Sequence, residues 1–397
     1  MPTALIIGGS VAGTRVALDL RRLGFTGEIT IADEQLEAPY DRPPLSKGAL
    51  TSADGAPSVL LSTEQAAAQG ICLRLGTKAA RLDVAGKAVV ADDGTRLGYD
   101  HLVVATGARP RPLPWPAHDR LLELRTLADG RRLRRALRSS GTLAVVGAGF
   151  IGAEVASAAR GLGLEVVMID PLPAPMSRLL GVEVGSRFGA LHAAHGVKTR
   201  FGTGVEEIAC GADGVVLRLA DGDTVTADIA VAGIGAQPAD GWLASSGLPV
   251  DGGLMCDSRC RVLDHEEIYA AGDIARWLHP RHREFVRVEH WTNAVEQAQF
   301  VARQIVSPSA QEFTPVEYVW SDQYDWKIQI AGRPERGTVH HLIDQPDRGR
   351  FCALYVGNEG ALSGMVTVNW PKAAILGRRA LAADVSPPGL GDQITRL

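Results

Sequence analysis

The sequence predicts an α/β fold with two nucleotide-binding domains of the Rossmann type, followed by a C-terminal α/β domain. Residues 4–7 and 29–32 are apolar runs that flank a glycine-rich turn and a helical pattern, which together predict a β-α-β unit. The same pattern recurs with strands expected at 143–146 and 166–169. From residue 315 onward, short apolar segments separated by turn residues predict an antiparallel sheet.

Length and composition agree with a multidomain globular protein. The chain has 397 residues, of which 46% are hydrophobic and 22% charged, and at about 150 residues per domain this length suggests two or three domains. Its 41 basic and 45 acidic side chains give a formal net charge of −4. This charge excludes a strong overall attraction to nucleic acid.

Neither a secretion signal nor a membrane span is expected. The five cysteines are too few and too scattered for a disulfide framework. A strand expected from Thr3 leaves no room for a signal segment before it. The most apolar stretch, residues 143–159, is interrupted by Glu154 and by glycines, which makes it a poor membrane span. We therefore expect a cytoplasmic protein that does not enter a membrane.

Turn and linker signals place the remaining elements. Residues 109–116 are proline-rich and predict an extended linker at a domain boundary, and a second change of domain is expected at 233–238. Further strands are expected at 215–219, 225–232, 327–330, 351–356 and 361–368. A short helix is expected from Pro371, and the end of the chain, with Pro387 and Pro388, is expected to be a loose tail.

The turn at residues 147–152, GAGFIG, carries the stronger of two nucleotide-binding signals. It satisfies the pattern G-x-G-x-x-G between an expected strand and an expected helix, and Asp170 ends the next strand. The glycines permit a tight turn and close approach of a pyrophosphate to the helix N-terminus, while the acidic residue accepts hydrogen bonds from a ribose. A glycine turn without a ligand is the alternative interpretation.

The turn at residues 8–13, GGSVAG, is a variant of the same pattern. Ser10 occupies the position of the second glycine, which leaves the pyrophosphate geometry open, and Asp33 supplies the acidic residue. Two nucleotide sites in one chain suggest an electron relay between a tightly bound flavin and a diffusible nicotinamide. Small residues at 105–107 and 270–272 end expected strands and permit close approach of a cofactor, and Asp273 could bond a ribityl chain.

The chain resembles the FAD-dependent, NADH-using ferredoxin reductases of the putidaredoxin reductase, rubredoxin reductase and dioxygenase-reductase type. The resemblance extends over nearly the whole chain. It rests on the segments 39–47 (PYDRPPLSK), 105–110 (ATGARP), 124–127 (LRTL), 147–156 (GAGFIGAEVA), 269–275 (YAAGDIA), 288–298 (VEHWTNAVEQA) and 320–332 (WSDQYDWKIQIAG).

The resemblance implies a glutathione-reductase-like architecture and two cofactors, FAD and NADH, with no metal. The implied FAD-binding domain comprises residues 1–108 and 237–314, the NAD-binding domain residues 109–236, and the C-terminal domain residues 315–397. The residues implied for FAD are Gly8, Ser10, Ala12, Gly13, Asp33, Arg42, Lys47, Ala79, Thr106, Gly107, Arg125, Gly272, Asp273, Glu289, His290 and Trp291. Those implied for NAD are Gly147, Gly149, Ile151, Gly152, Glu154, Asp170 and Gly235.

The implied reaction is electron transfer from NADH to an iron–sulfur ferredoxin, or to a rubredoxin, that feeds an oxygenase such as a cytochrome P450 or a ring-hydroxylating dioxygenase. Lys47, Glu154 and Trp291 are the implied catalytic residues. A cation at Lys47 would stabilise a reduced, anionic flavin and hold Glu154 near the nicotinamide. Trp291 would cover the flavin, although a tryptophan in the core is a plausible alternative. We expect a monomer or a weak dimer.

Other functions fit the sequence less well. Disulfide reductases, NADH peroxidases and NADH oxidases need a redox cysteine after the first β-α-β unit, and no cysteine precedes Cys72. Cys256 and Cys260 are expected to be structural, and the histidine pairs 192/195 and 279/282 are not expected to bind metal. The arginine-rich helix expected at 131–138 leaves open a flavoprotein of the apoptosis-inducing-factor type, with a binding or signalling role.

Overall fold

The computed structural model describes residues 1–52, 55–383 and 387–397. The chain divides into two units, each assembled from segments that are far apart in the sequence. The first unit consists of Met1–Asp41, Pro57–Arg109 and Ala236–Pro315, and the second of Arg42–Ala56, Pro110–Gly235 and Val316–Leu397.

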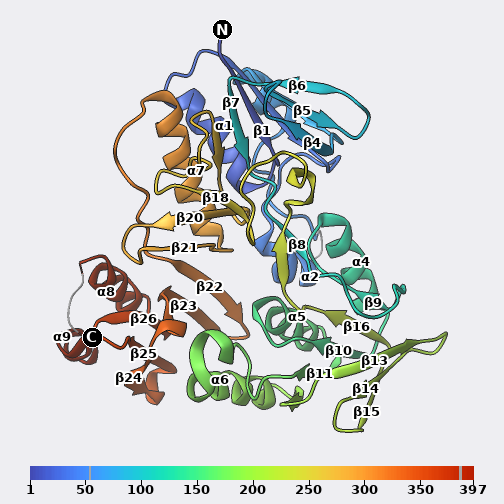
Figure 1. Cartoon of the computed structure of the whole chain (residues 1–397). Helices are drawn as coiled ribbons and strands as arrows, with labels where there is room; N and C mark the ends of the chain where they lie inside the picture. The colour runs from blue at the N-terminus through green and yellow to red at the C-terminus, as the bar shows by residue number, and fades with distance from the viewer. Residues whose placement is uncertain (53–54, 384–386) are drawn as a thin grey trace. The chain divides into compact units, whose positions relative to one another are not determined.

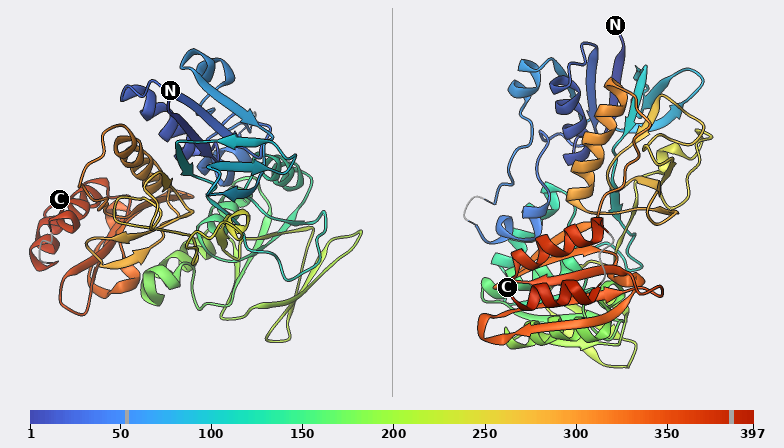
Figure 2. Two further views of the ribbon diagram at one scale, coloured as in Figure 1. Left: turned by 45° about the horizontal axis from the view of Figure 1, so that its top comes forward. Right: turned by 90° about the vertical axis from the view of Figure 1, so that its left-hand side faces the viewer.

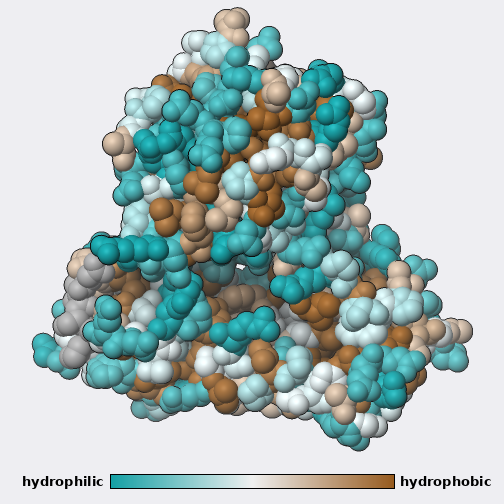
Figure 3. Space-filling model, in the orientation of Figure 1, coloured by the Kyte–Doolittle hydropathy of each residue, from teal (hydrophilic) through white to brown (hydrophobic). Residues whose placement is uncertain are grey.

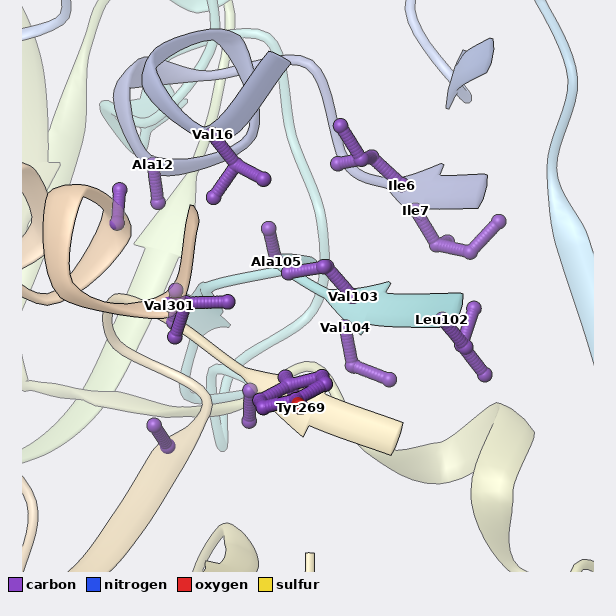
Figure 4. Packing of buried hydrophobic residues seen from close by; sticks show 14 of the residues in the cluster. Ile6, Ile7, Ala12, Val16, Leu102, Val103, Val104, Ala105, Tyr269 and Val301 are labelled. Atoms are coloured by element: carbon purple, nitrogen blue, oxygen red, sulfur yellow. The ribbon is translucent and has the colours of Figure 1, made fainter. Parts of the chain in front are cut away.

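A five-stranded parallel sheet forms the centre of the first unit, in the order β19-β7-β1-β2-β3. Its strands are β1 (Thr3–Ile7), β2 (Glu28–Asp33), β3 (Ile71–Leu75), β7 (His101–Val104) and β19 (Ile268–Ala270). Helices α1 (Val11–Arg22) and α7 (Trp291–Val306) lie side by side in this unit (Figure 1). Figure 4 shows Val16 of α1 and Val301 of α7 in the same apolar cluster as side chains of β1 and β7. Because helices cover it, the central strands are apolar and buried.

Smaller elements complete the first unit. They are α3 (Thr63–Ala68), the antiparallel sheet of β4 (Ala79–Asp83), β5 (Ala88–Ala91) and β6 (Arg96–Gly98), the sheet of β18 (Leu254–Cys256), β20 (Ala275–His279) and β21 (Glu284–Val286), and the paired strands β8 (Ala108–Pro110) and β17 (Ala236–Pro238). Cys256 and Cys260 are fully buried in its apolar core, as expected for structural cysteines.

The second unit repeats the parallel arrangement, in the order β12-β11-β10-β16-β9. The strands are β9 (Leu121–Leu122), β10 (Thr142–Val146), β11 (Glu165–Asp170), β12 (Lys198–Phe201) and β16 (Ile229–Ala232). The unit also contains the short helix α2 (Gly48–Thr51), the helices α4 (Leu127–Arg138), α5 (Phe150–Gly161) and α6 (Ser177–Ala194), and the antiparallel sheet of β13 (Val205–Cys210), β14 (Val215–Leu219) and β15 (Thr224–Ala227). The arginine-rich helix α4 is amphipathic, with Leu133 and Leu137 buried.

The single strand predicted at 225–232 is wrong. The structure has two strands there, because β15 pairs antiparallel with β14 whereas β16 pairs parallel with β10. The break falls at Asp228, whose carboxylate accepts hydrogen bonds from the backbone of Gly141 and Thr142, at 2.6 and 2.8 Å. Because Asp228 makes these bonds, it separates the antiparallel pairing of β15 from the parallel pairing of β16.

The C-terminal part of the second unit is a five-stranded antiparallel sheet, which confirms the predicted strand-rich region. Its strands are β22 (Tyr318–Gln323), β23 (Trp326–Gly332), β24 (Thr338–Gln345), β25 (Arg350–Val356) and β26 (Leu362–Val368). Side chains alternate between two faces along β25. Phe351, Ala353 and Tyr355 pack with α6, whereas Cys352 and Leu354 face the helices at the end of the chain.

The helix predicted from Pro371 is confirmed, but the loose tail predicted after it is wrong over the described residues. Helix α8 (Pro371–Ala382) begins at the predicted proline, and the tail forms a further helix, α9 (Pro387–Thr395). Figure 2 shows both helices over the sheet. Leu390 and Ile394 of α9 are buried in the apolar core of this region. The burial of these side chains stabilises a helix that its proline and glycine content disfavours.

In the described ranges 1–52, 55–383 and 387–397, no helix combines the length and the apolar character that crossing a bilayer requires. Hydrophilic residues predominate on the face drawn in Figure 3, and hydrophobic residues form small groups between them. The most exposed large hydrophobic side chains, Leu36 and Val59 among them, stand at separate positions along the chain. Such isolated positions are normal on protein surfaces.

A buried histidine joins α6 to the C-terminal sheet. His192 is fully buried, and its Nδ1 lies 2.9 Å from the hydroxyl of Tyr324, in the turn between β22 and β23. The ring of Tyr324 stacks on His195 at 3.8 Å. Burial lowers the pKa of His192 to about 4, partly opposed by the neighbouring Gln323 side chain. The folded protein therefore holds this imidazole neutral near neutral pH.

Replacing His192 with glutamine should make the protein less sensitive to acid. The unfolded chain takes up a proton on this residue near its ordinary pKa of 6.5, whereas the folded chain resists until about pH 4, so stability is lost as pH falls through this window. Between about pH 7 and pH 4.5 we expect the wild type to lose about 2 kcal/mol more than His192→Gln in free energy of unfolding. Urea titrations at several pH values measure the free energy of unfolding of both proteins. Equal losses in the wild type and in His192→Gln would contradict the lowered pKa of His192.

Candidate functional site

The two glycine turns have nearly the same backbone geometry. Gly8 and Gly147 have φ angles of +107° and +102°, a region that favours glycine. A Cβ on Gly8 would lie 2.3 Å from the carbonyl oxygen of Ala105, and one on Gly147 would lie 2.4 Å from that of Gly233. Both turns thus need glycine at the first position for conformation and for space.

The last glycine of each turn lets the following helix approach the turn closely. A Cβ on Gly13 would lie 1.9 Å from the carbonyl oxygen of Gly8, and one on Gly152 would lie 2.0 Å from that of Gly147. Any larger residue would push the helix away from the turn. Helices α1 and α5 therefore begin directly at the turns, with their N-terminal N–H groups beside the glycines.

The serine in the first turn does not alter its shape. Ser10 caps α1 with φ −75° and ψ −166°, and Gly149 caps α5 with φ −75° and ψ −172°. These are extended angles that any residue adopts, so the second glycine is not required for the conformation. Neither helix has a side-chain cap, and a Cβ on Gly149 would meet no atom within 4 Å. The turns thus fit a phosphate group against the helix N-termini.

Each turn has a carboxylate at the end of the next strand. Asp33 accepts a hydrogen bond from the backbone N–H of Gly9, and Asp170 accepts one of 2.7 Å from Ala148, the equivalent position. The other carboxylate oxygen accepts a bond of 2.8 Å from the residue two positions further on in both cases. These bonds hold the carboxylates beside the turns, where a ribose of a bound dinucleotide would reach them.

Several residues implied for the flavin gather near the first turn. A Cβ on Gly272 would lie 3.2 Å from the Cβ of Ala12, so α1 and the segment after β19 are in close contact. The N–H of Gly272 donates to the side chain of Gln297 at 2.9 Å. Thr106 donates to the carbonyl of Ala239 at 3.0 Å, and Gly107 has a φ of +70°.

The remaining residues implied in the first unit lie near the start of α7 or at β4. Trp291 is the first residue of α7, and its Nε1 donates to Asp41 at 2.8 Å, which fixes the orientation of the indole. His290 precedes it as the N-cap of the helix. Glu289 forms an ion pair with Arg287, which also donates to the carbonyl of Asp273 at 3.1 Å. Ala79 begins β4 and is half-buried.

The second unit contains a buried carboxylate with three donors. Glu154, on α5, is only 3% exposed. It accepts hydrogen bonds from the hydroxyls of Ser46 and Ser321, the latter at 2.6 Å, and its Oε1 lies 2.8 Å from the Nζ of Lys47. The Lys47 side chain is 20% exposed, so the cost of desolvation falls on the carboxylate, which needs further hydrogen bonds to offset it. The two serines supply them.

The local structure around Lys47 directs its side chain. A short 3₁₀ helix, η1 (Pro43–Ser46), begins with prolines and ends at Lys47, which has non-helical angles between η1 and α2. This break allows adjacent residues, Ser46 and Lys47, to reach the same carboxylate. Arg42 caps η1 and belongs to the same segment.

The other residues implied for the cofactors in the second unit surround the second turn or α4. Ile151, in the first turn of α5, is 42% exposed. Gly235 has a φ of +110°, and a Cβ there would lie 3.3 Å from the Nε of Arg111. The backbone N–H of Arg125 donates to Asp129 at 3.1 Å, next to the N-cap Thr126 of α4.

Sequence reasoning missed the hydroxyl donors Ser46 and Ser321 and the acceptor Asp41. All three lie inside segments that carry the family resemblance, but neither their spacing nor their residue type indicates a partner more than a hundred positions away. One signal was available. A glutamate on the buried face of α5, beyond the first turn, needs donors from other elements, because the backbone N–H groups at this point of the helix bond within the helix.

Comparison with known proteins covers nearly the whole chain. Residues 2–298 match the pyridine nucleotide-disulphide oxidoreductase family, and residues 318–395 match the reductase C-terminal family. Rhodocoxin reductase of Rhodococcus erythropolis is 38% identical over 387 residues, which is 96% of this chain and 90% of the relative. The ferredoxin–NAD(+) reductase component of the anthranilate 1,2-dioxygenase system of Burkholderia cepacia is 35% identical and covers 96% and 95%.

A solved structure agrees with these similarities. The reductase in the covalent putidaredoxin reductase–putidaredoxin complex has a TM-score of 0.92 and is 31% identical, with 99% of this chain and 96% of that chain covered. The similarity includes the parallel sheets and the C-terminal antiparallel sheet.

Proposed function

The chain belongs to the pyridine nucleotide-disulphide oxidoreductase family and, within it, to the ferredoxin reductases that serve oxygenases. From this membership and from the geometry of the site, we infer which residues hold the cofactors and which kind of partner receives the electrons. The chain is an NAD(H)-dependent ferredoxin reductase with the predicted glutathione-reductase-like fold. Membership of the family implies FAD and NAD(H) as its cofactors.

We assign FAD to the turn at residues 8–13 and NADH to the turn at residues 147–152. Two matching turns, each with a carboxylate fixed beside it, are the observation that carries this assignment. Residues 1–108 and 237–314 would form the FAD-binding domain, residues 109–236 the NAD-binding domain and residues 315–397 the C-terminal domain. The chemistry that bound FAD supplies is the conversion of a two-electron hydride into single electrons.

Lys47 and Glu154 are proposed to act beside the reacting rings. Lys47 would place a positive charge where negative charge develops during reduction, and Glu154 would hold the lysine and a polar edge of the nicotinamide. Their contact at 2.8 Å and the burial of Glu154 support a fixed arrangement. Trp291, oriented by Asp41, would present an apolar ring surface that excludes water.

The proposed partner is an iron–sulfur ferredoxin, which we expect to be acidic; the relative from Burkholderia cepacia is named as the ferredoxin–NAD(+) reductase component of a dioxygenase system. The putidaredoxin reductase structure contains such a partner, putidaredoxin. Because this chain has a net charge of −4, attraction to an acidic carrier must come from local groups of basic residues.

The purified protein is expected to be yellow, with one FAD per chain, and to reduce ferredoxin with NADH. We would measure flavin content by absorption after release from the protein, and electron transfer with a panel of purified ferredoxins and rubredoxins. Fast turnover with one carrier would support the proposal. A folded, colourless protein that cannot be reconstituted with FAD would refute it, and bound FAD with slow turnover on every carrier would favour a binding or signalling flavoprotein.

Replacement of Lys47 by alanine should slow the reduction of bound flavin by NADH by about ten- to a hundredfold, because an electrostatic contact at the site of charge development is lost. FAD should remain bound. Rapid mixing under single-turnover conditions measures the rate, and Lys372→Ala, at an exposed lysine on α8, is the control. An unchanged rate of flavin reduction in Lys47→Ala would contradict the catalytic role of Lys47.

NADH should be strongly preferred over NADPH. Asp170 would repel the 2′-phosphate of NADPH, and its bonds to Ala148 and Leu172 prevent it from turning away. Asp170→Ala is expected to reduce kcat/KM for NADH and to narrow the ratio between the two nucleotides. The exposed Asp213 provides the matched control, Asp213→Ala. Equal use of both nucleotides by the wild type would contradict this assignment.

A further inference from the structure

The carboxylate of Glu154 receives one of its donors from the C-terminal sheet. Ser321 lies on β22, is fully buried, and donates to Glu154 Oε1 at 2.6 Å. The same oxygen contacts Lys47, so Ser321 shares the atom that forms the ion pair. The two residues of this hydrogen bond come from regions that match different families, since Glu154 lies within residues 2–298 and Ser321 within residues 318–395.

The direction of the Ser321 hydroxyl is set by a second residue. Gln323, two positions further along β22, is also fully buried, and its Nε2 donates to the Ser321 oxygen at 3.3 Å. Residues two apart on a strand share a face. An amide N–H can only donate and a carboxylate can only accept, so the serine hydrogen must point at Glu154. Both hydrogen bonds are therefore donated in the direction of Glu154, from Gln323 to Ser321 and from Ser321 to the carboxylate.

The turn after β22 fixes this strand against α5, and the two elements lie side by side (Figure 1). The N–H of Tyr324 donates to the hydroxyl of Ser157 at 2.7 Å, and Ser157 lies one helical turn after Glu154. Tyr324 has a φ of +52°, a left-handed conformation that is costly for a residue with a side chain. Its bonds to Ser157 and His192 and its stacking on His195 offset that cost. The hairpin is held in one register, with Ser321 opposite Glu154.

We propose that Ser321, oriented by Gln323, is a positioning residue that fixes the Glu154 carboxylate for hydride transfer. This proposal rests on the proposed role of Glu154 and deepens it. The C-terminal sheet would then support the redox site directly, through a hydrogen bond to the carboxylate that pairs with Lys47. Ser46 holds the other oxygen, Oε2, so that the two serines together prevent rotation of the carboxylate.

The test is a double-mutant cycle in the full-length flavoprotein. Ser321→Ala should lower the limiting rate of flavin reduction by about tenfold, the loss expected for a hydrogen bond to a charged group, with the NADH dissociation constant changed by less than about twofold. In the Glu154→Gln background the same change should have little further effect, because the residue acts through the carboxylate. The exposed Ser186→Ala, on α6, is the matched control.

A second measurement does not depend on turnover. The infrared carboxylate band of Glu154, identified by its loss in Glu154→Gln, should shift in Ser321→Ala without NADH present. Gln323→Met should give a smaller shift and a smaller loss of rate, and it provides an independent test if Ser321→Ala folds poorly. An unshifted band, or a loss of rate that persists in Glu154→Gln, would overturn the proposal. If Glu154→Gln itself reduced flavin at the wild-type rate, the proposed role of Glu154 would fail instead.

Discussion

The ion pair between the buried carboxylate of Glu154 and the ammonium group of Lys47, whose side chain is 20% exposed, is the interaction on which the arrangement of the second unit depends. A carboxylate removed from water is costly unless other groups complete its hydrogen bonds. Ser46 and Ser321 do so for Glu154. The need to satisfy one charge thus brings together the segment at 43–51, helix α5 and strand β22.

The glycine turns allow a pyrophosphate group to approach a helix N-terminus closely. Their shape is enforced by contacts between backbone atoms, such as Gly13 against Gly8 and Gly152 against Gly147. The carboxylates of Asp33 and Asp170 add hydrogen bonds that tie each turn to the neighbouring strand. The shape of both turns is therefore set by contacts within the chain.

The sequence predicts the features that follow from local rules. The two β-α-β units, helix α8 and the antiparallel C-terminal strands follow from periodicity, glycine turns and prolines. Long-range interactions account for the failures. Asp228 divides a predicted strand through bonds to residues on β10 and before it, and the burial of Leu390 and Ile394 makes a helix of a tail rich in proline and glycine. The serine donors to Glu154 depend on contacts across more than a hundred positions, which no local pattern encodes.

Helix α6 limits where the C-terminal region can be exchanged between related chains. Its buried residues Leu180, Val184 and Phe188 pack with β23, β25 and β26, so one apolar core crosses from the region that matches the oxidoreductase family to the region that matches the C-terminal family. If the C-terminal region were exchanged between relatives at the sequence boundary near residue 318, α6 would pack against a sheet whose side chains fit the α6 of another protein. A functional chimera must therefore inherit α6 together with the sheet, and recombination is expected to respect this core rather than the order of the segments along the chain.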